Sequence, residues 1–158
     1  MNEIIELIII TFIPALELRA SIPYGVFKTD FPLLTIFLIC VVANILLAPL
    51  LYWFLNNIIH IFLRIKFIEK LYQKTIVHVQ KKVQPYVKKY GILGLSIFIG
   101  IPLPGSGVYS GAIGAYVLGF NFKDFFKAAV VGVLIAGIIV LLISTTGNSA
   151  WNFLIKKV

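Results

Sequence analysis

Long uninterrupted runs of apolar residues dominate this chain. Residues 33–55 carry no charged side chain over 23 positions, and residues 128–144 are equally uncharged. A helix of about 20 residues crosses a hydrocarbon core about 30 Å thick. The pattern therefore predicts two membrane-spanning helices. Pro49 should kink the first of them, and Asn44 gives it a polar position.

Two further apolar regions are interrupted. Residues 4–27 contain an apolar arm, then PALELRASIPYG, then a short second arm. Residues 91–119 contain GILGLSIFIGI, then PLPGSG, then VYSGAIGAYVLG. Paired prolines and glycines stop a helix and free its terminal N–H and C=O groups, which survive at membrane depth only inside protein or beside water. We expect both regions to be either re-entrant hairpins or interrupted spans.

The order of these regions suggests an internal duplication. Each half has a broken region followed by a spanning helix, and the pattern Gly-x4-Asp-Phe begins at Gly25 and again at Gly119. Broken segments at matching positions of two halves point to the binding site of a transporter. The expected architecture is all-α: two similar halves, each a broken (re-entrant) helical hairpin followed by one transmembrane helix, joined by a basic amphipathic helix. The single membrane domain would divide into residues 1–63, 64–90 and 91–158.

Composition confirms the membrane class and charge orients the chain. With 60% hydrophobic and 13% charged residues, the chain cannot be a soluble enzyme, a disordered chain or a secreted disulfide scaffold. Eight of the 14 basic residues lie within residues 64–90, which marks the cytoplasmic side of a plasma-membrane protein rather than a nucleic-acid-binding face. The rule gives the same orientation for re-entrant and for crossing segments, so both topologies stay open. The acidic start MNEIIE does not resemble a cleaved signal, and the lone Cys40 cannot form an intrachain disulfide.

The basic connector has an amphipathic pattern. At 3.6 residues per turn one face gathers five of its lysines, with apolar residues clustered on the opposite face: Lys66, Lys70, Lys74, Lys81 and Lys88. Such a helix is typical of a membrane surface rich in anionic lipid, although a charged helix in solution between two spans would also fit. The lysines expected to contact lipid are Lys66, Lys70, Lys74 and Lys81.

Two charges stand apart from the connector, because Glu17 and Arg19 lie within an apolar stretch. A charge at bilayer depth costs at least about 2.5–3.5 kcal/mol, so its default interpretation is functional. Pro14 and Pro23 already break this segment. The pair could form a salt bridge that holds the hairpin in shape, or each member could face a substrate group or a proton path.

The second break offers a different kind of site. A helix that begins near Ser106 would present free N–H groups and a positive dipole end, which suit a phosphate or carboxylate when paired with Arg19. Alternatively the segment is a tight hairpin tip, with Gly107 and Gly111 serving helix packing. Ala128, Gly132 and Ala136 read as a packing face. The candidate substrate or ion pathway comprises Glu17, Arg19, Pro14, Pro23, Gly25, Pro102, Pro104, Gly105, Ser106 and Gly107.

Searches for catalytic chemistry give nothing. His60 and His78 have no ligand cluster around them, and no nucleotide-binding loop or nucleophile–base arrangement is present. We therefore expect no metal, no cofactor and no enzymatic activity.

The motifs of the two breaks carry a family resemblance. ELRASIPYG, from Glu17 to Gly25, and PLPGSG, from Pro102 to Gly107, resemble those of the putative small multidrug export proteins, and more distantly the DedA (SNARE-associated, or VTT) membrane proteins. The second resemblance implies two re-entrant helices in inverted halves, lipid-carrier flipping and proton-coupled transport. Since IGIPLPGSGVYSG contains no arginine, only Glu17 and Arg19 take over its implied roles.

The leading hypothesis is a small secondary transporter or lipid-carrier flippase. Glu17 would be the proton or coupling-ion site, Arg19 the anion contact, and the glycine-proline turns a gate near the midplane. A chain of 158 residues has too few helices to enclose a pathway alone, so we expect a homodimer or larger assembly. The alternative is a non-transporting membrane organiser or scaffold that binds anionic lipid through its basic connector.

Overall fold

The computed structural model describes residues 2–14, 16–57, 87, 90–103 and 105–155. All regular elements within these ranges are helices, and no strand occurs among them, in agreement with the predicted all-α class. The six helices are α1 (Glu3–Phe12), α2 (Glu17–Lys28), α3 (Leu33–Asn57), α6 (Ile92–Gly100), α7 (Val108–Val117) and α8 (Phe122–Ile155).

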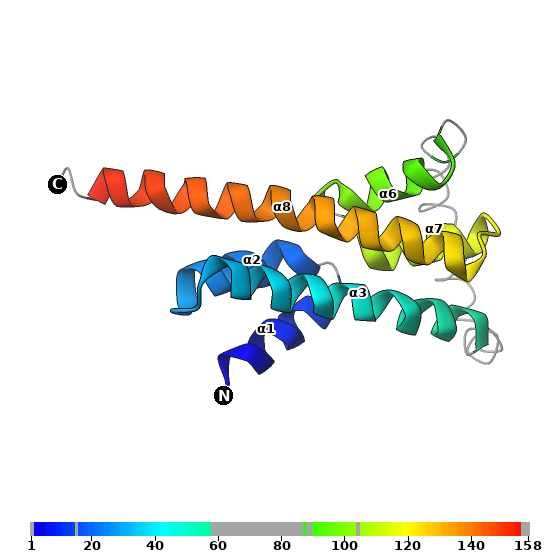
Figure 1. Cartoon of the computed structure of the whole chain (residues 1–158), viewed down its shortest axis with the longest axis horizontal. Coiled ribbons are helices and arrows are strands. Elements are labelled where there is room, and N and C mark those ends of the chain that lie inside the picture. Colours follow the sequence, from blue (N-terminus) through cyan, green and yellow to red (C-terminus); the bar gives the residue numbers. More distant parts are fainter. Residues whose placement is uncertain (1, 15, 58–86, 88–89, 104, 156–158) are drawn as a thin grey trace, which may run out of the picture.

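The two predicted spanning helices are present as α3 and α8. Leu33–Asn57 and Phe122–Gly147 are both long and apolar enough to cross a membrane. They lie side by side and run in opposite directions (Figure 1). The exposed face of α3 carries a stripe of large apolar side chains, as expected of a face in contact with lipid: Leu34, Leu38, Val42, Leu46, Leu50 and Trp53.

The short helices lie in two pairs on opposite halves of the long axis (Figure 1). In one half, α1 runs toward the middle of the molecule and α2 returns, and the last turns of α8 extend beyond both. In the other half, α6 runs toward the middle and α7 returns. Helix α2 packs against α8, and α7 packs against α3. The start of α2 and the start of α7 consequently meet near the centre.

The first break is shorter than the sequence suggested. It covers only the residues between Phe12 and Glu17, and Pro14 lies in it. Pro23 and Gly25, which were expected in the break, lie inside α2, so that part of the prediction is wrong. A Cβ atom on Gly25 would lie 2.5 Å from Cγ2 of Ile36. Gly25 therefore serves close packing of α2 on α3, and a helix containing one proline continues because tertiary contacts hold it.

The second break falls where the sequence placed it. Helix α6 ends at Gly100 and α7 begins at Val108. Gly105 and Gly107 have positive φ values of 81° and 103°, which explains why glycine occurs at both positions. Pro102 and Ser106 lie in the same link, whereas Pro104 lies outside the described residues.

Small residues make the central packing faces. Ala128, Gly132 and Ala136 are buried, which confirms the predicted packing face of α8. A Cβ atom on Gly132 would lie 2.6 Å from Cβ of Ile99, and one on Gly111 would lie 2.5 Å from Cγ1 of that residue. Helices α6, α7 and α8 thus approach one another around a single isoleucine.

The two copies of the pattern Gly-x4-Asp-Phe do not have equivalent conformations, because Gly25 is helical while Gly119 has φ 75° between α7 and α8. The connector cannot be compared with its prediction, because residues 64–90 lie outside the described part of the chain apart from Val87 and Tyr90. The lysines predicted to contact lipid, Lys66, Lys70, Lys74 and Lys81, are among the residues not described.

Candidate functional site

Glu17 is a buried carboxylate at the first position of α2. Only 4% of the residue is exposed, although its side chain is polar. Its φ of 44° is the one positive value among the described non-glycine residues. That conformation costs of order 1–3 kcal/mol and persists only where the surroundings impose it, which is common at functional sites.

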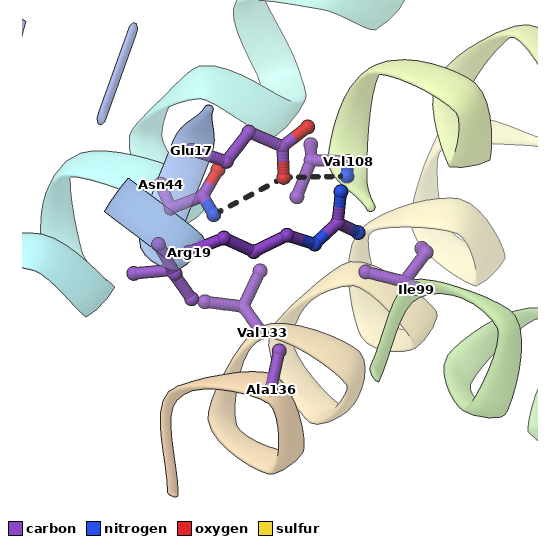
Figure 2. A pocket seen from close by; sticks show the side chains of 8 residues that line it. Glu17, Arg19, Asn44, Ile99, Val108, Val133 and Ala136 are labelled. Carbon is purple, nitrogen blue, oxygen red and sulfur yellow. Dashed lines mark hydrogen bonds between the residues drawn. The ribbon is translucent and has the colours of Figure 1, made fainter. Parts of the chain in front are cut away.

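The carboxylate of Glu17 lies at the start of α7. Oε2 accepts a hydrogen bond from the backbone N–H of Val108 at 3.1 Å, and Oε1 accepts one from that of Tyr109 at 3.3 Å. Asn44 of α3 donates to Oε2 from Nδ2 at 3.5 Å. Figure 2 shows Glu17 between Asn44 and Val108.

This arrangement refines the anion seat predicted at the second break. The first N–H groups of a helix have no partner within it and favour negative charge. At α7 they bind the chain's own Glu17, across 91 positions of sequence, rather than standing open to a ligand. The carboxylate therefore joins the two broken regions.

Gly107 makes this approach possible. A Cβ atom there would lie 2.6 Å from Oε2 and 2.9 Å from Oε1 of Glu17. The residue is also in a conformation, φ 103°, that side chains rarely adopt. Glycine at position 107 therefore leaves room for the Glu17 carboxylate.

Arg19 reaches the second break separately. Its Nη2 donates to Oγ of Ser106 at 2.7 Å. The Ser106 hydroxyl in turn lies within donating distance of the carbonyl oxygens of Ile101, at 2.5 Å, and Leu103, at 2.8 Å. Among the described residues Glu17 and Arg19 form no ion pair with each other. Of the alternatives left open by the sequence, the self-neutralising salt bridge is therefore not the one observed.

A third link comes from a residue that the sequence did not single out. The Tyr109 hydroxyl donates to the backbone carbonyl of Phe12, the last residue of α1, at 2.5 Å. Asn44 was noted only as a polar position, and its contact with Glu17 was also missed. A polar side chain inside an uncharged span was the available signal for Asn44, since such groups face the protein interior.

A small cavity lies beside the carboxylate. It has a volume of about 10 Å³, and Figure 2 shows its lining side chains. Two of the residues that line it each carry one side-chain atom without a hydrogen-bond partner among the described residues, namely Nη1 of Arg19 and Oδ1 of Asn44. The lining comprises Glu17, Leu18, Arg19, Asn44, Ile99, Val108, Val133 and Ala136.

A larger and more open cavity, the vestibule, is also lined by Arg19. Its volume is about 200 Å³, and it is lined by Arg19, Pro23, Pro102, Val140, Ile143 and Ser144. Three of the predicted pathway residues, Arg19, Pro23 and Pro102, thus meet around one space. Pro14, Gly25 and Gly105 line neither this vestibule nor the small cavity.

Comparison with known proteins places the chain in a family. A sequence model described as "Putative small multi-drug export protein" matches residues 17–139, which are 123 of the 158 residues. The matched segment begins at Glu17, directly after the first break, and contains the second break. Searches of curated proteins and of solved structures find no match.

Proposed function

We propose, from the premise that this chain belongs to the putative small multi-drug export protein family, that it is a small secondary transporter or lipid-carrier flippase of the cell membrane. In this proposal Glu17 binds the coupling proton and Arg19 contacts an anionic group of the substrate. The family description suggests transport rather than catalysis.

One observation carries the proposal: the buried Glu17 carboxylate holds the first turn of α7 to the first turn of α2. Hydrogen bonds to an ionised acceptor are about twice as strong as bonds between neutral groups. Protonation would replace the carboxylate opposite the N–H groups of Val108 and Tyr109 with a neutral carboxyl group, which is a weaker acceptor. Proton binding would thereby loosen the contact between the two breaks.

The arrangement of the helices supports an alternating-access mechanism. We propose that α1–α2 and α6–α7 are re-entrant hairpins that enter the membrane from opposite sides, as in the inverted halves of the DedA proteins. Antiparallel α3 and α8 and the reciprocal packing of α2 on α8 and α7 on α3 support this. Transporter sites typically lie where interrupted helices meet near the midplane.

The vestibule supports the role of Arg19. Arg19 is its one charged residue, and most of the remaining lining is apolar. A guanidinium can bind a phosphate or carboxylate through two parallel N–H groups. A substrate with one anionic group and an apolar portion would suit this space. The other parts of the proposal are a homodimer or larger assembly and a cytoplasmic connector.

A flux assay tests this function. The purified protein is reconstituted in liposomes that contain a pH-sensitive dye, a proton gradient is imposed, and alkyl phosphates are added outside. We expect proton flux that requires the alkyl phosphate and is lost in Glu17→Gln and in Arg19→Ala. Lys28→Gln, at the exposed end of α2, is the matched control and should retain the flux. Flux that survives both Glu17→Gln and Arg19→Ala overturns the proposal.

The organiser hypothesis makes the opposite prediction. Neutralising Lys66, Lys70, Lys74 and Lys81 would abolish function there, while the changes at Glu17 and Arg19 would have little effect. The buried contacts of Glu17 favour the transporter, because an organiser that acts through its connector has no use for them.

A further inference from the structure

We propose that the small cavity beside Glu17 is a binding site for one water molecule that delivers the proton to this carboxylate, with Asn44 as its positioning residue. The inference rests on the proposed function, because it concerns how Glu17 receives its proton. It adds a site and a residue that the proposed function does not contain.

Two residues that line the cavity each have one side-chain atom without a hydrogen-bond partner in the described part of the chain. Nη1 of Arg19 is a donor without an acceptor, and Oδ1 of Asn44 is an acceptor without a donor, among the described residues. Asn44 is only 1% exposed. Leaving a buried polar group unpaired costs about 1–3 kcal/mol. In this proposal one water molecule accepts from Nη1 and donates to Oδ1.

The volume of the cavity fits one water molecule. The cavity volume of about 10 Å³ corresponds to about one water position and is too small for an organic ligand. A buried water also needs two to four polar partners. Arg19 and Asn44 supply two, and the Glu17 carboxylate, which lines the same cavity, supplies a third.

The orientation of the Asn44 amide fits an ionised Glu17. Its Nδ2 faces Oε2 of Glu17, and its Oδ1 stays unpaired. The reversed amide would place oxygen against the carboxylate and lose that hydrogen bond. The amide therefore holds its acceptor free for the water for as long as Glu17 is charged.

The proton step balances as a relay from hydronium. A hydronium ion in the vestibule gives one proton to the cavity water while that water gives one of its own protons to Glu17. At each transfer one O–H bond breaks and one forms, and neutral water remains in both places. Arg19 lines both the cavity and the vestibule, so a movement of this one side chain connects them.

The groups that face Glu17 are few. Arg19 is the charged one, on α2, and Tyr109 on α7 adds a phenol that is bonded to Phe12. Helix α3 contributes the neutral Asn44, and α6 and α8 contribute apolar lining. No second carboxylate among the lining residues competes for the proton.

Water-edited solid-state NMR of the full chain in lipid bilayers tests the site. The probe is water itself, and the readout is the rate at which magnetisation passes from water to each asparagine side-chain amide. We expect the buried Asn44 amide to receive it about as fast as the exposed Asn57 amide, which is the matched control on the same helix. Transfer to Asn44 as slow as to the buried backbone amide of Ala48 overturns the inference.

Filling the cavity provides a second arm. Ala136→Val should expel the water, so that transfer to Asn44 falls and deuterium exchange at protonated Glu17, followed by its infrared carbonyl band, slows by about tenfold, the effect of losing one ordinary hydrogen bond. Val133→Ile fills the same cavity if Ala136→Val does not fold. Unchanged exchange in a folded variant contradicts the inference. Since neither readout uses transport, a dry cavity leaves the flux result standing, and a wet cavity without coupled flux removes only the proposed function.

Discussion

At the scale of a single residue, Glu17 accepts hydrogen bonds from the first N–H groups of α7, and in the proposed function it also binds the coupling proton. Glu17→Ala leaves the N–H groups of Val108 and Tyr109 without an acceptor, and we expect a loss of about 1–3 kcal/mol in the free energy of unfolding. Glu17→Gln retains an acceptor and should lose less. Equilibrium unfolding in lipid nanodiscs measures both, with the exposed Glu3→Ala as control. A Glu17→Ala variant as stable as the wild type would refute the capping role.

Gly107 allows a sharper test of the same contact. Gly107→Ala combines a strained φ with an overlap of the new Cβ and the Glu17 carboxylate, whereas Gly119→Ala has a strained φ and no atom within 4 Å. We expect the former to cost more, and the excess to vanish in a Glu17→Ala background. Thermal unfolding of Gly107→Ala and Gly119→Ala, each alone and in the Glu17→Ala background, gives this comparison. Additive effects would mean that the carboxylate is not where the structure has it.

At the scale of helices, the sequence predicted the long apolar helices better than the residues at which helices begin and end. Two uncharged runs sufficed for α3 and α8, and the closely spaced Pro102 and Gly107 marked the second break. Pro23 misled, because a helix tolerates one proline where neighbouring helices hold it. The role of Gly25 depends on Ile36, which is distant in sequence, so no local pattern contained it.

The packing around Ile99 gives a prediction at this scale. A Cβ on Gly111 would overlap only the Ile99 side chain, while one on Gly132 would also lie 2.7 Å from the backbone oxygen of Ser96. Each alanine substitution should destabilise the protein by about 1–3 kcal/mol through overpacking. In an Ile99→Ala background the cost at Gly111 should disappear and the cost at Gly132 should remain. Thermal unfolding in nanodiscs distinguishes the two, and rescue of both would contradict the helix contact described.

At the scale of the whole molecule, the two pairs of short helices decide the topology. If α1–α2 and α6–α7 each return to the side from which they enter, only α3 and α8 cross the membrane. Reporters fused to the N- and C-termini should then both read outside, and a reporter in the connector should read inside. Cytoplasmic termini would mean four crossings and would contradict inverted halves.

The sequence analysis paired Arg19 with the second break around a ligand, but the direct contacts that join the two breaks could not be read from the sequence. Glu17 and Arg19 were identified from their charge alone, but their partners, Val108 and Ser106, lie 91 and 87 positions away. Only the folded arrangement shows that each charge binds the other break rather than its neighbour in sequence. The functional claim for the whole molecule rests on this connection between distant segments.

The most direct measurement is the distance between α2 and the second break as a function of pH, by pulsed electron paramagnetic resonance. Spin labels at the exposed positions Phe27 and Leu103, in a Cys40→Ala background, report it. We predict that lowering the pH shifts the wild-type distance distribution, and that Glu17→Gln shows the low-pH distribution at every pH. A wild type that does not respond to pH, or a Glu17→Gln variant that responds as the wild type does, would contradict this prediction.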